Sequence, residues 1–589
     1  MLMEEVILDK IKNINIKKLK RFSDKKLILL CNDIRAFLIN NISKTGGHIG
    51  ANLGTIEISV AIHKIFNSPK DKIIFDTGHQ AYTHKILTGR LKKFKFLNKY
   101  KKGFSRFTDR KESKHDIIDV SHAATSISIS SGLAFKKDFK NKVVAIIGDG
   151  SLVEGMAFEA LNYVSDRKIP LLIVLIDNGY AIDKNVGGIK YMTSGKNWVS
   201  KSKNFFESIG LNYECEKNGH DVVKLYKKLK KLKNLKKTTI FHIKTIKGLG
   251  LEISKNHPYK MHFSMPFDVN SGKGAAPTLP GKSYASELAS QMEKYLNKNK
   301  DLFIITPATP YSNNLQELIK RFPKNVLDVG MAEQHAAGMA AGFALNKKNV
   351  VLCYQSTFMQ RAFDQIFHDI AFMNLPVTIL SSRSGFAGYD SATHHSLMDL
   401  SYLRAIPNIE IYYPSTVEDS CKILNSRLYG NNKNTKPLVL LHQYEPVNFE
   451  HKPKIKKSGY DFFSISSKKN LIITTGNYIN RAMEIKSKLI KKNILVNILC
   501  LKYIKPIDKN ISKIIKNYKN VVVIEENTIM GGIGSEVIKI SNASKNKNKI
   551  NIFGVKDIFI NPGNSIECSK EAQIDIEYIG NKLLKIFSV

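Results

Sequence analysis

The stretch that decides the fold is Val143-Val144-Ala145-Ile146-Ile147, followed at once by Gly148-Asp149-Gly150. Five consecutive apolar residues, most of them β-branched, are typical of a strand buried on both faces, and the glycines predict a turn at its end. A helical pattern follows at 156–164, and a second apolar run follows at 171–176. Strand, turn, helix and strand in this order predict a βαβ unit of a parallel sheet.

The same alternation continues along the chain. Further strands are predicted at 350–353, 377–380, 438–441, 471–475, 494–501 and 521–524. Small residues at 271–284 and a Lys- and Ser-rich stretch at 451–468 predict linkers. We therefore expect an α/β protein with three parallel-sheet domains, at 1–270, 285–450 and 469–589.

Composition narrows the possible classes of protein. The chain has 589 residues, of which 43% are hydrophobic, and it is long enough to bury several cores without disulfides or structural metals. Its apolar runs are too short to cross a bilayer, and its first residues contain no apolar signal segment, so we expect no membrane association. Six scattered cysteines without a CxxC motif indicate a reducing compartment, and the expected location is the cytoplasm.

The formal net charge of +40 raises the question of a nucleic-acid or anionic partner. The basic residues are mostly lysines, spread along the chain and mixed with Ile and Asn. Compositional drift toward these three residue types explains the charge without a partner, so we expect no nucleic acid. Anionic substrates, which a basic protein would attract, stay possible.

Oxygen ligands follow two of the predicted strands. Asp149 lies in the first turn, and Asn178 comes just after the strand at 171–176. Ligands of open parallel sheets bind at the carboxyl ends of strands. Asp149, the side chain of Asn178 and the backbone oxygen of Tyr180 would suit Mg2+ that also binds a diphosphate. Gly148 and Gly150 would let the backbone approach the phosphates, and the helix after Gly150 would offer them free N–H groups.

Other motifs occur in a fixed order along nearly the whole chain. They are SKTGGHIGANLG at 43–54, DTGHQAYTHKILTGR at 76–90, AEQH at 332–335, STFMQRA at 356–362, ATHH at 392–395, LSYLR at 400–404, YIKPID at 503–508 and EEN at 525–527. With the two strand-end turns, they resemble the 1-deoxy-D-xylulose-5-phosphate synthase family of the thiamine-diphosphate-dependent transketolase superfamily.

The resemblance implies a diphosphate-binding, a pyrimidine-binding and a C-terminal transketolase-type domain, with thiamine diphosphate and Mg2+ as cofactors, in a homodimer. It implies the decarboxylating condensation of pyruvate with D-glyceraldehyde 3-phosphate to 1-deoxy-D-xylulose 5-phosphate and CO2. One alternative is a related carboligase with another donor or acceptor. A second is a basic nucleic-acid binder that has lost catalysis, which the presence of Asp149, Asn178 and Glu333 disfavours.

The resemblance also assigns roles to individual residues. Glu333, the sole acidic residue in a stretch of small side chains, could be a helix charge facing solvent, but the resemblance makes it the carboxyl that activates the cofactor. Such a group must hold a proton near neutral pH, which requires an apolar setting. The residues expected to handle protons are His48, His79 and His394. Those expected to bind the cofactor are His79, His122, Gly148, Asp149, Gly150, Ser151, Asn178, Lys247 and Glu333, with His262 at a further cofactor-side position. Those expected to bind substrate are Arg361, Arg383, Asp390 and His394.

The sequence departs from the family pattern mainly on the acceptor side. His122 stands in SHAATS where the family has GHSSTS, and Gln355 replaces an aromatic residue. The residues at 309–313 replace a Met-Arg-Glu-Gly-Ser string, and those at 441–446 replace Arg-Tyr-Pro-Arg-Gly, so one phosphate-binding arginine is missing. Losing one charge-assisted partner would weaken phosphate binding roughly ten- to a hundredfold. The acceptor, and whether one subunit or two form the site, stay open.

Overall fold

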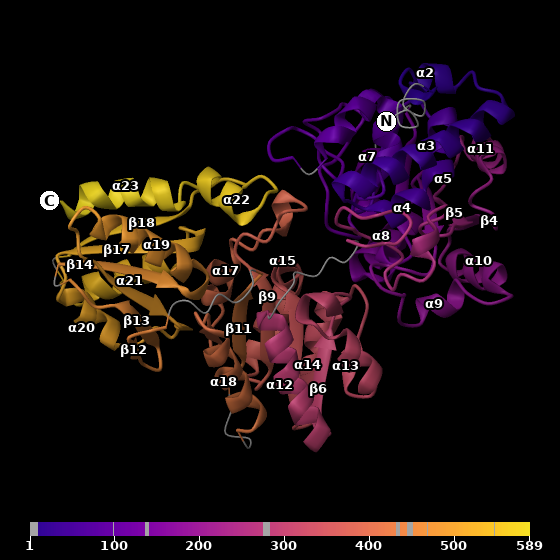
Figure 1. The fold of residues 1–589 in the computed structure, drawn as a ribbon. Coiled ribbons are helices and arrows are strands. Elements are labelled where there is room, and N and C mark those ends of the chain that lie inside the picture. The colour runs from indigo at the N-terminus through magenta and orange to yellow at the C-terminus, as the bar shows by residue number, and fades with distance from the viewer. Residues whose placement is uncertain are drawn as a thin grey trace. The chain divides into compact units, whose positions relative to one another are not determined.

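The computed structural model describes residues 10–97, 99–135, 141–274, 283–430, 436–444, 452–467, 469–546 and 548–588. The chain forms two compact units, Met1–Thr278 with Gly330–Ala332, and Leu279–Val329 with Glu333–Val589 (Figure 1). Each unit is described by itself. No helix within the described ranges combines the length and apolar character needed to cross a bilayer.

The first unit is built on a wholly parallel sheet in the order β1-β2-β3-β5-β4. Its strands are β1 (Lys72–Phe75), β2 (Val143–Gly148), β3 (Leu172–Asp177), β4 (Asn212–Glu216) and β5 (Thr239–Lys244). Alternate residues of β2 face two different cores: Val144 and Ile146 belong to one, and Val143 and Ala145 to the other. Burial on both faces explains the unbroken apolar run from which the strand was predicted.

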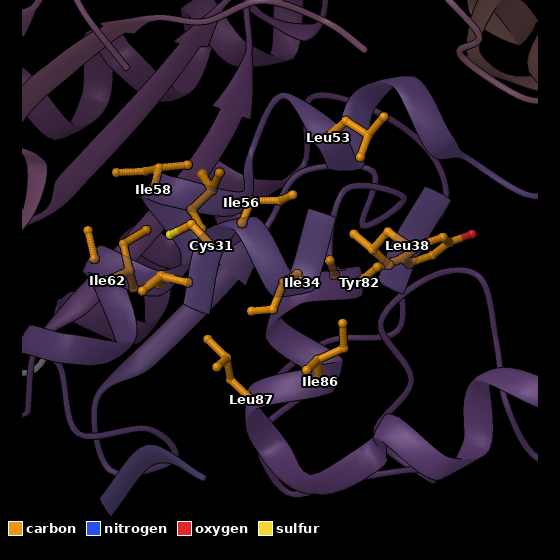
Figure 2. Close-up of a cluster of buried hydrophobic side chains, with 14 of the residues drawn as sticks. Cys31, Ile34, Leu38, Leu53, Ile56, Ile58, Ile62, Tyr82, Ile86 and Leu87 are labelled. Carbon is orange, nitrogen blue, oxygen red and sulfur yellow. The ribbon is translucent and has the colours of Figure 1, made fainter. Parts of the chain in front are cut away.

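Helices cover this sheet on both faces. Their bounds are α2 (Ile16–Leu19), α3 (Asp24–Thr45), α4 (Ile49–Leu53), α5 (Ile56–Ile65), α6 (Tyr82–Lys85), α7 (Ser126–Ala134), α8 (Gly155–Asp166), α9 (Ile189–Met192), α10 (Trp198–Ser208) and α11 (Val222–Lys231), with short turns η1 (Ile86–Arg90), η2 (Leu91–Phe96), η3 (Ser151–Val153) and η4 (Glu252–Ser254). Figure 2 shows the core between α3, α5 and α6, where Ile34, Leu38, Ile62, Tyr82 and Ile86 are fully buried or nearly so.

The second unit contains two sheets. The first has the order β16-β10-β11-β9-β8-β6-β7 and is parallel except for β16. Its strands are β6 (Leu302–Thr306), β7 (Val326–Asp328), β8 (Asn349–Gln355), β9 (Thr378–Ser384), β10 (Glu410–Tyr412), β11 (Leu438–Gln443) and β16 (Tyr503–Lys505). The helices along this part are α12 (Tyr284–Lys298), α13 (Gln316–Arg321), α14 (Glu333–Leu345), α15 (Ser356–Met359), α16 (Phe363–Gln365), α17 (Asp399–Ala405) and α18 (Val417–Leu428), with η5 (Pro310–Asn313), η6 (Gln360–Ala362), η7 (Ile366–Phe372) and η8 (Ala392–His394).

The last sheet has the order β12-β13-β15-β14-β17-β18. Its strands are β12 (Ile455–Lys456), β13 (Tyr460–Ser464), β14 (Asn470–Thr475), β15 (Asn497–Leu501), β17 (Asn520–Thr528) and β18 (Lys549–Val555). The accompanying helices are α19 (Ile479–Ile490), α20 (Asn510–Lys516), α21 (Ile533–Ala543), α22 (Ser565–Glu571) and α23 (Ile576–Phe587), with η9 (Gly476–Tyr478). Because β16 comes from this region yet pairs with β10, the two sheets belong to one unit.

The predicted fold class is confirmed, since parallel pairing dominates all three sheets. The linker predicted at 451–468 is wrong in part, because β12 and β13 form there, pair with each other antiparallel, and join the sheet through the pairing of β13 with β15. The lysines and serines around these two short strands hid them, and β12 forms the edge of the sheet. The linker predicted at 271–284 falls partly on residues 275–282, outside the described residues. The three domain boundaries stay predictions.

Candidate active site

The turn after β2 and the loop after β3 are held together by Asp149, which is buried. One carboxylate oxygen accepts hydrogen bonds from the backbone N–H groups of Asn178 (3.2 Å) and Gly179 (2.7 Å) and from the side chain of Asn185 (2.8 Å). The other accepts from the N–H of Gly150 at 3.0 Å. The two turns predicted to meet therefore do meet.

The predicted magnesium ligands lie within this same cluster. The Oδ1 of Asn178 accepts a hydrogen bond from the N–H of Tyr180 at 3.1 Å, which folds the loop back on itself. Burial and the charge of Asp177 raise the pKa of Asp149 to about 8. In the described parts of the chain, no group of three or more His, Cys, Asp and Glu side chains could hold a metal ion. A divalent ion here would use the mixed oxygen set of Asp149, Asn178 and Tyr180, completed by a diphosphate.

Gly150 is required by close packing and not by its backbone angles. A Cβ at this position would lie 2.5 Å from the Cβ of Ala181 and 2.8 Å from its Cα, whereas a Cβ at Gly148 would meet open space. The helix predicted at 156–164 is confirmed as α8, but it does not follow Gly150 directly. Ser151 begins the short turn η3, an extended Glu154 interrupts the chain, and α8 starts only afterwards.

Lys247 extends the cluster on its other side. Its buried ammonium donates to the backbone oxygen of Ala181 at 2.5 Å and lies 5.8 Å from the ring centroid of Tyr180. Burial lowers the pKa of Lys247 to about 7, although the charges of Asp149 and Asp183 oppose this. An anion bound nearby would keep the ammonium charged.

Three histidines gather beside this loop cluster. The ring centroids of His48 and His79 are 5.2 Å apart, and that of His262 lies 5.5 Å from the first and 4.9 Å from the second. Phe107 and Phe263 pack against His48. Burial and the neighbouring Lys247 hold the pKa of His262 well below its usual value, and its Nδ1 has no hydrogen-bond partner among the described residues.

Asn52 fixes the spacing of two of these histidines, and sequence reasoning did not single it out. Its amide nitrogen donates to the backbone oxygens of His48 (2.6 Å) and His79 (2.8 Å), and its Oδ1 accepts from the N–H of Tyr82 (2.8 Å). The residue is buried. A single amide therefore joins the loops that carry both histidines. The asparagine in the GANLG motif is the sequence feature that could have pointed to this role.

Asp76 has a similar role for the segment that carries His122. Its two carboxylate oxygens accept hydrogen bonds from the N–H groups of Ala124 (2.9 Å) and Ser126 (3.1 Å). His122 itself is half-buried. The segment that departs from the family pattern is thus fixed directly to the loop that carries His79.

A buried ionic network lies under the same loops. Asp116 accepts two hydrogen bonds from the guanidinium of Arg90, at 2.6 and 2.8 Å, and one from Nε2 of His84 at 2.9 Å. Nδ1 of His84 in turn lies 2.8 Å from His63. Although burial opposes it, the hydrogen bonds from His84 and Arg90 hold the pKa of Asp116 well below its usual range. The network fixes the segment from 104 to 119, which brings Phe107 against His48.

In the second unit, Glu333 is the first residue of α14 and is only 6% exposed, so it is not a helix charge facing solvent. The hydroxyl of buried Tyr354 donates to its backbone oxygen at 2.6 Å. Its carboxyl Oε2 is buried and has no hydrogen-bond partner within the described ranges. Desolvation raises the pKa of Glu333 to about 7.

The predicted substrate residues follow nearby strands of the same unit. The carboxylate of Asp390 lies 3.9 Å from Nδ1 of His394, whose ring packs against Phe358. Arg361 lies in η6 and is half-buried. Arg383 is the second-last residue of β9, and its guanidinium carbon lies 5.2 Å from the ring centroid of Tyr311 and 4.5 Å from that of Tyr444. Neither tyrosine was singled out from the sequence.

The replacement at Gln355 is accommodated inside the fold. Its buried Oε1 accepts a hydrogen bond from the hydroxyl of Ser312 at 2.9 Å. The preceding aromatic residue, Tyr354, points toward Glu333 instead. The two departures at 309–313 and 355 are therefore in contact with each other.

Comparisons with known proteins agree along the chain. The family model described as 1-deoxy-D-xylulose-5-phosphate synthase matches residues 8–201 and 190–245. The models of the transketolase pyrimidine binding domain and of the transketolase C-terminal domain match residues 281–444 and 465–579.

Proteins named 1-deoxy-D-xylulose-5-phosphate synthase match this chain over almost its full length. The 1-deoxy-D-xylulose-5-phosphate synthase of Clostridium acetobutylicum is 36% identical over 628 residues, which cover 98% of each chain. That of Halothermothrix orenii is 35% identical over 614 residues, or 96% of each chain. On these matches, and with the order of its sheets and site motifs, the chain belongs to the 1-deoxy-D-xylulose-5-phosphate synthase family.

Proposed function

We propose that this chain condenses pyruvate with D-glyceraldehyde 3-phosphate to form 1-deoxy-D-xylulose 5-phosphate and CO2, using thiamine diphosphate and Mg2+. The observation that carries the proposal is identity of 36% to a synthase of that name across 98% of both chains. The site residues support it, because the buried polar groups named above have the chemistry that the cofactor and Mg2+ require.

The fit rests on three features of the chain. The oxygens of Asp149, Asn178 and Tyr180 form a hard-ligand set of the kind that Mg2+ shares with a diphosphate. Gly150 leaves room for the neighbouring loop, because a Cβ at its position would lie 2.5 Å from the Cβ of Ala181. In the other unit, the buried Oε2 of Glu333 has no partner in the part of the chain that the structure describes.

When bound, thiamine diphosphate supplies a thiazolium carbon that adds to a carbonyl and stores the electron pair left by decarboxylation. Glu333 would hold the proton that activates the aminopyrimidine, and its pKa of about 7 suits exchange near neutral pH. Lys247 would offset charge on the diphosphate. His48 and His79 would move protons at the reacting oxygens. Asn52 holds the two backbone segments that carry them side by side.

On the acceptor side, His394 would exchange a proton with the aldehyde oxygen, and Asp390 would accept a hydrogen bond from a hydroxyl of the substrate. Their side chains are 3.9 Å apart, so both can face the same substrate atoms. Arg361 and Arg383 would bind the anionic groups of the substrates.

A steady-state assay tests the proposal. The purified protein, with thiamine diphosphate and Mg2+, is given pyruvate labelled at its carboxyl carbon together with glyceraldehyde 3-phosphate, and labelled CO2 and pentulose phosphate are measured. We expect equal amounts of both. Absence of CO2 release would refute the proposal. The same assay is repeated with other aldehydes in place of glyceraldehyde 3-phosphate. Product from one of these alone would favour a related carboligase, the alternative that the departures at 309–313 and 441–446 suggest.

We further propose that the enzyme is a homodimer in the cytoplasm. All six cysteines are free thiols, which fits a reducing compartment. Light scattering on the purified protein measures the assembly, and a mass of one chain at micromolar concentration would contradict the dimer.

A further inference from the structure

Arg383 is placed by an irregular strand pairing. Between β9 and β11 the register shifts, so that Leu441 pairs with Ser381 but Gln443 pairs with Ser384. Two residues of β9 therefore oppose the single residue His442, which is a β-bulge. Arg383 lies in this bulge with φ of +63°, a left-handed conformation that is uncommon for residues with a side chain. Bulges of this kind redirect a side chain at functional sites.

The redirected guanidinium lies between two aromatic rings. Its central carbon is 5.2 Å from the ring centroid of Tyr311 and 4.5 Å from that of Tyr444. All three side chains are half-buried. Within the described residues, Arg383 makes no hydrogen bond and no ion pair. The faces of the two rings stabilise the positive charge, but they accept no conventional hydrogen bond from the guanidinium N–H groups. The N–H groups of the guanidinium can thus donate hydrogen bonds to a ligand.

The neighbouring His442 does not replace the missing arginine. It is almost fully buried and stacks on Tyr284 with ring centroids 6.0 Å apart. Burial and the charge of Arg383 lower the pKa of His442 to about 4, so it is neutral near pH 7. The anion site therefore depends on Arg383 for positive charge at this bulge.

Tyr311 and Tyr444 both come from segments where the chain departs from the family pattern, at 309–313 and 441–446. We propose that these two tyrosines are positioning residues that hold the Arg383 guanidinium by its flanks, so that its N–H groups bind the phosphate of an aldehyde phosphate. This aromatic clamp, defined as Tyr311 and Tyr444 about Arg383, compensates for the arginine that the chain lacks. The inference rests on the proposed function, because it assigns the acceptor class for that same site.

A plain packing role predicts something different. If the tyrosines only filled space, their loss would affect phosphorylated and unphosphorylated aldehydes alike. If the tyrosines orient the guanidinium, their loss would weaken the use of phosphorylated aldehydes and leave unphosphorylated aldehydes nearly unaffected. Phenylalanine keeps the ring face and removes the hydroxyl, whereas leucine keeps apolar bulk and removes the ring, so the two variants separate these roles.

The test uses the full-length holoenzyme with Tyr444→Phe, Tyr444→Leu, Tyr311→Phe and Tyr311→Leu. Tyr163→Leu is the matched control, because it removes an exposed tyrosine that lies 5.8 Å from Arg167. We expect each leucine variant to raise KM for glyceraldehyde 3-phosphate by about 5- to 30-fold. We expect kcat and KM for unphosphorylated glyceraldehyde to change less than about twofold, and the phenylalanine and control variants to resemble the parent.

A binding measurement separates this inference from the proposed function. Calorimetric titration with sn-glycerol 3-phosphate, a phosphate monoester that cannot react, should show weaker binding in the leucine variants by the same factor. If the parent releases no CO2 from pyruvate but binds this probe through the clamp, the proposed reaction fails and the clamp stands. Unchanged probe affinity in both leucine variants, or equal loss for both aldehydes, would overturn the clamp.

Discussion

Asn52 offers the sharpest test of how the first unit places its histidines. Replacement by alanine removes three hydrogen bonds at once, to the backbone oxygens of His48 (2.6 Å) and His79 (2.8 Å) and from the N–H of Tyr82 (2.8 Å). Because Asn52 is 1% exposed, water does not replace them without opening the structure.

The magnitude follows from these three bonds. Each intramolecular hydrogen bond contributes about 0.5–1.5 kcal/mol, and a buried group left without a partner costs more. We expect Asn52→Ala to lower the free energy of unfolding of the first unit by about 2–4 kcal/mol. The two histidine loops would also lose their common anchor, so kcat should fall by roughly 10- to 100-fold.

The chain contains its own probe for this measurement. Trp198, the one tryptophan of the sequence, lies in the first unit, where its ring centroid is 4.7 Å from that of His242. Its emission in a urea titration therefore reports the unit that carries Asn52. Asn13→Ala is the control, because Asn13 is an exposed asparagine of the same unit.

Asn52→Asp refines the test, since the carboxylate keeps the acceptor for Tyr82 and loses both donors. We expect it to be at least as damaging as alanine, because it places a buried negative charge against two carbonyl oxygens. If Asn52→Ala unfolded within about 0.5 kcal/mol of the control and kept full activity, the anchoring argument would be refuted.

Three further outcomes are expected. Burial raises the pKa of Glu333 from 4.5 to about 7, so between these pH values the folded cofactor-free protein keeps a proton that the unfolded chain releases. The free energy of unfolding therefore falls by roughly 3 kcal/mol as pH rises across that interval. Glu333→Gln should flatten this fall, measured by thermal unfolding at pH 5 and pH 8, and an identical pH dependence of the two proteins would contradict it. Gly150→Ala would place a Cβ 2.5 Å from that of Ala181 and should weaken Mg2+-dependent binding of thiamine diphosphate at least tenfold by calorimetry, and an affinity equal to the parent's would contradict this. Asp116→Asn removes one partner of a buried ion pair and should destabilise the first unit by about 3–5 kcal/mol in the urea titration, and a loss below 1 kcal/mol would show that the network is dispensable.

Local sequence signals were sufficient where the structure depends on neighbouring residues. The strands at 143–147 and 171–176 were predicted nearly at their observed bounds, because strands buried on both faces must be continuously apolar. The Asp149 and Asn178 turns were expected to meet, since parallel strands bring their carboxyl ends to one edge. The buried setting of Glu333 was expected from the family resemblance, since the small residues around it left a solvent-facing helix charge open.

Prediction failed where the deciding partner is distant in sequence. The strands β12 and β13 lie in a Lys- and Ser-rich stretch that resembles a linker, and β13 is a strand because it pairs with β15, about 35 residues further on. Neither the bulge at Arg383 nor the ring of Tyr311 beside it leaves a local pattern.

By itself, then, the sequence determined the α/β class, the family and the chemical types present at the site, because apolar periodicity and motif order are properties of neighbouring residues. Tertiary structure alone decided which side chains support that chemistry. Asn52 became an anchor for two histidine loops, and Tyr444 became a neighbour of Arg383, only through contacts between distant segments. The geometry of such contacts is fixed by the packing of whole elements, which no short stretch of the chain encodes.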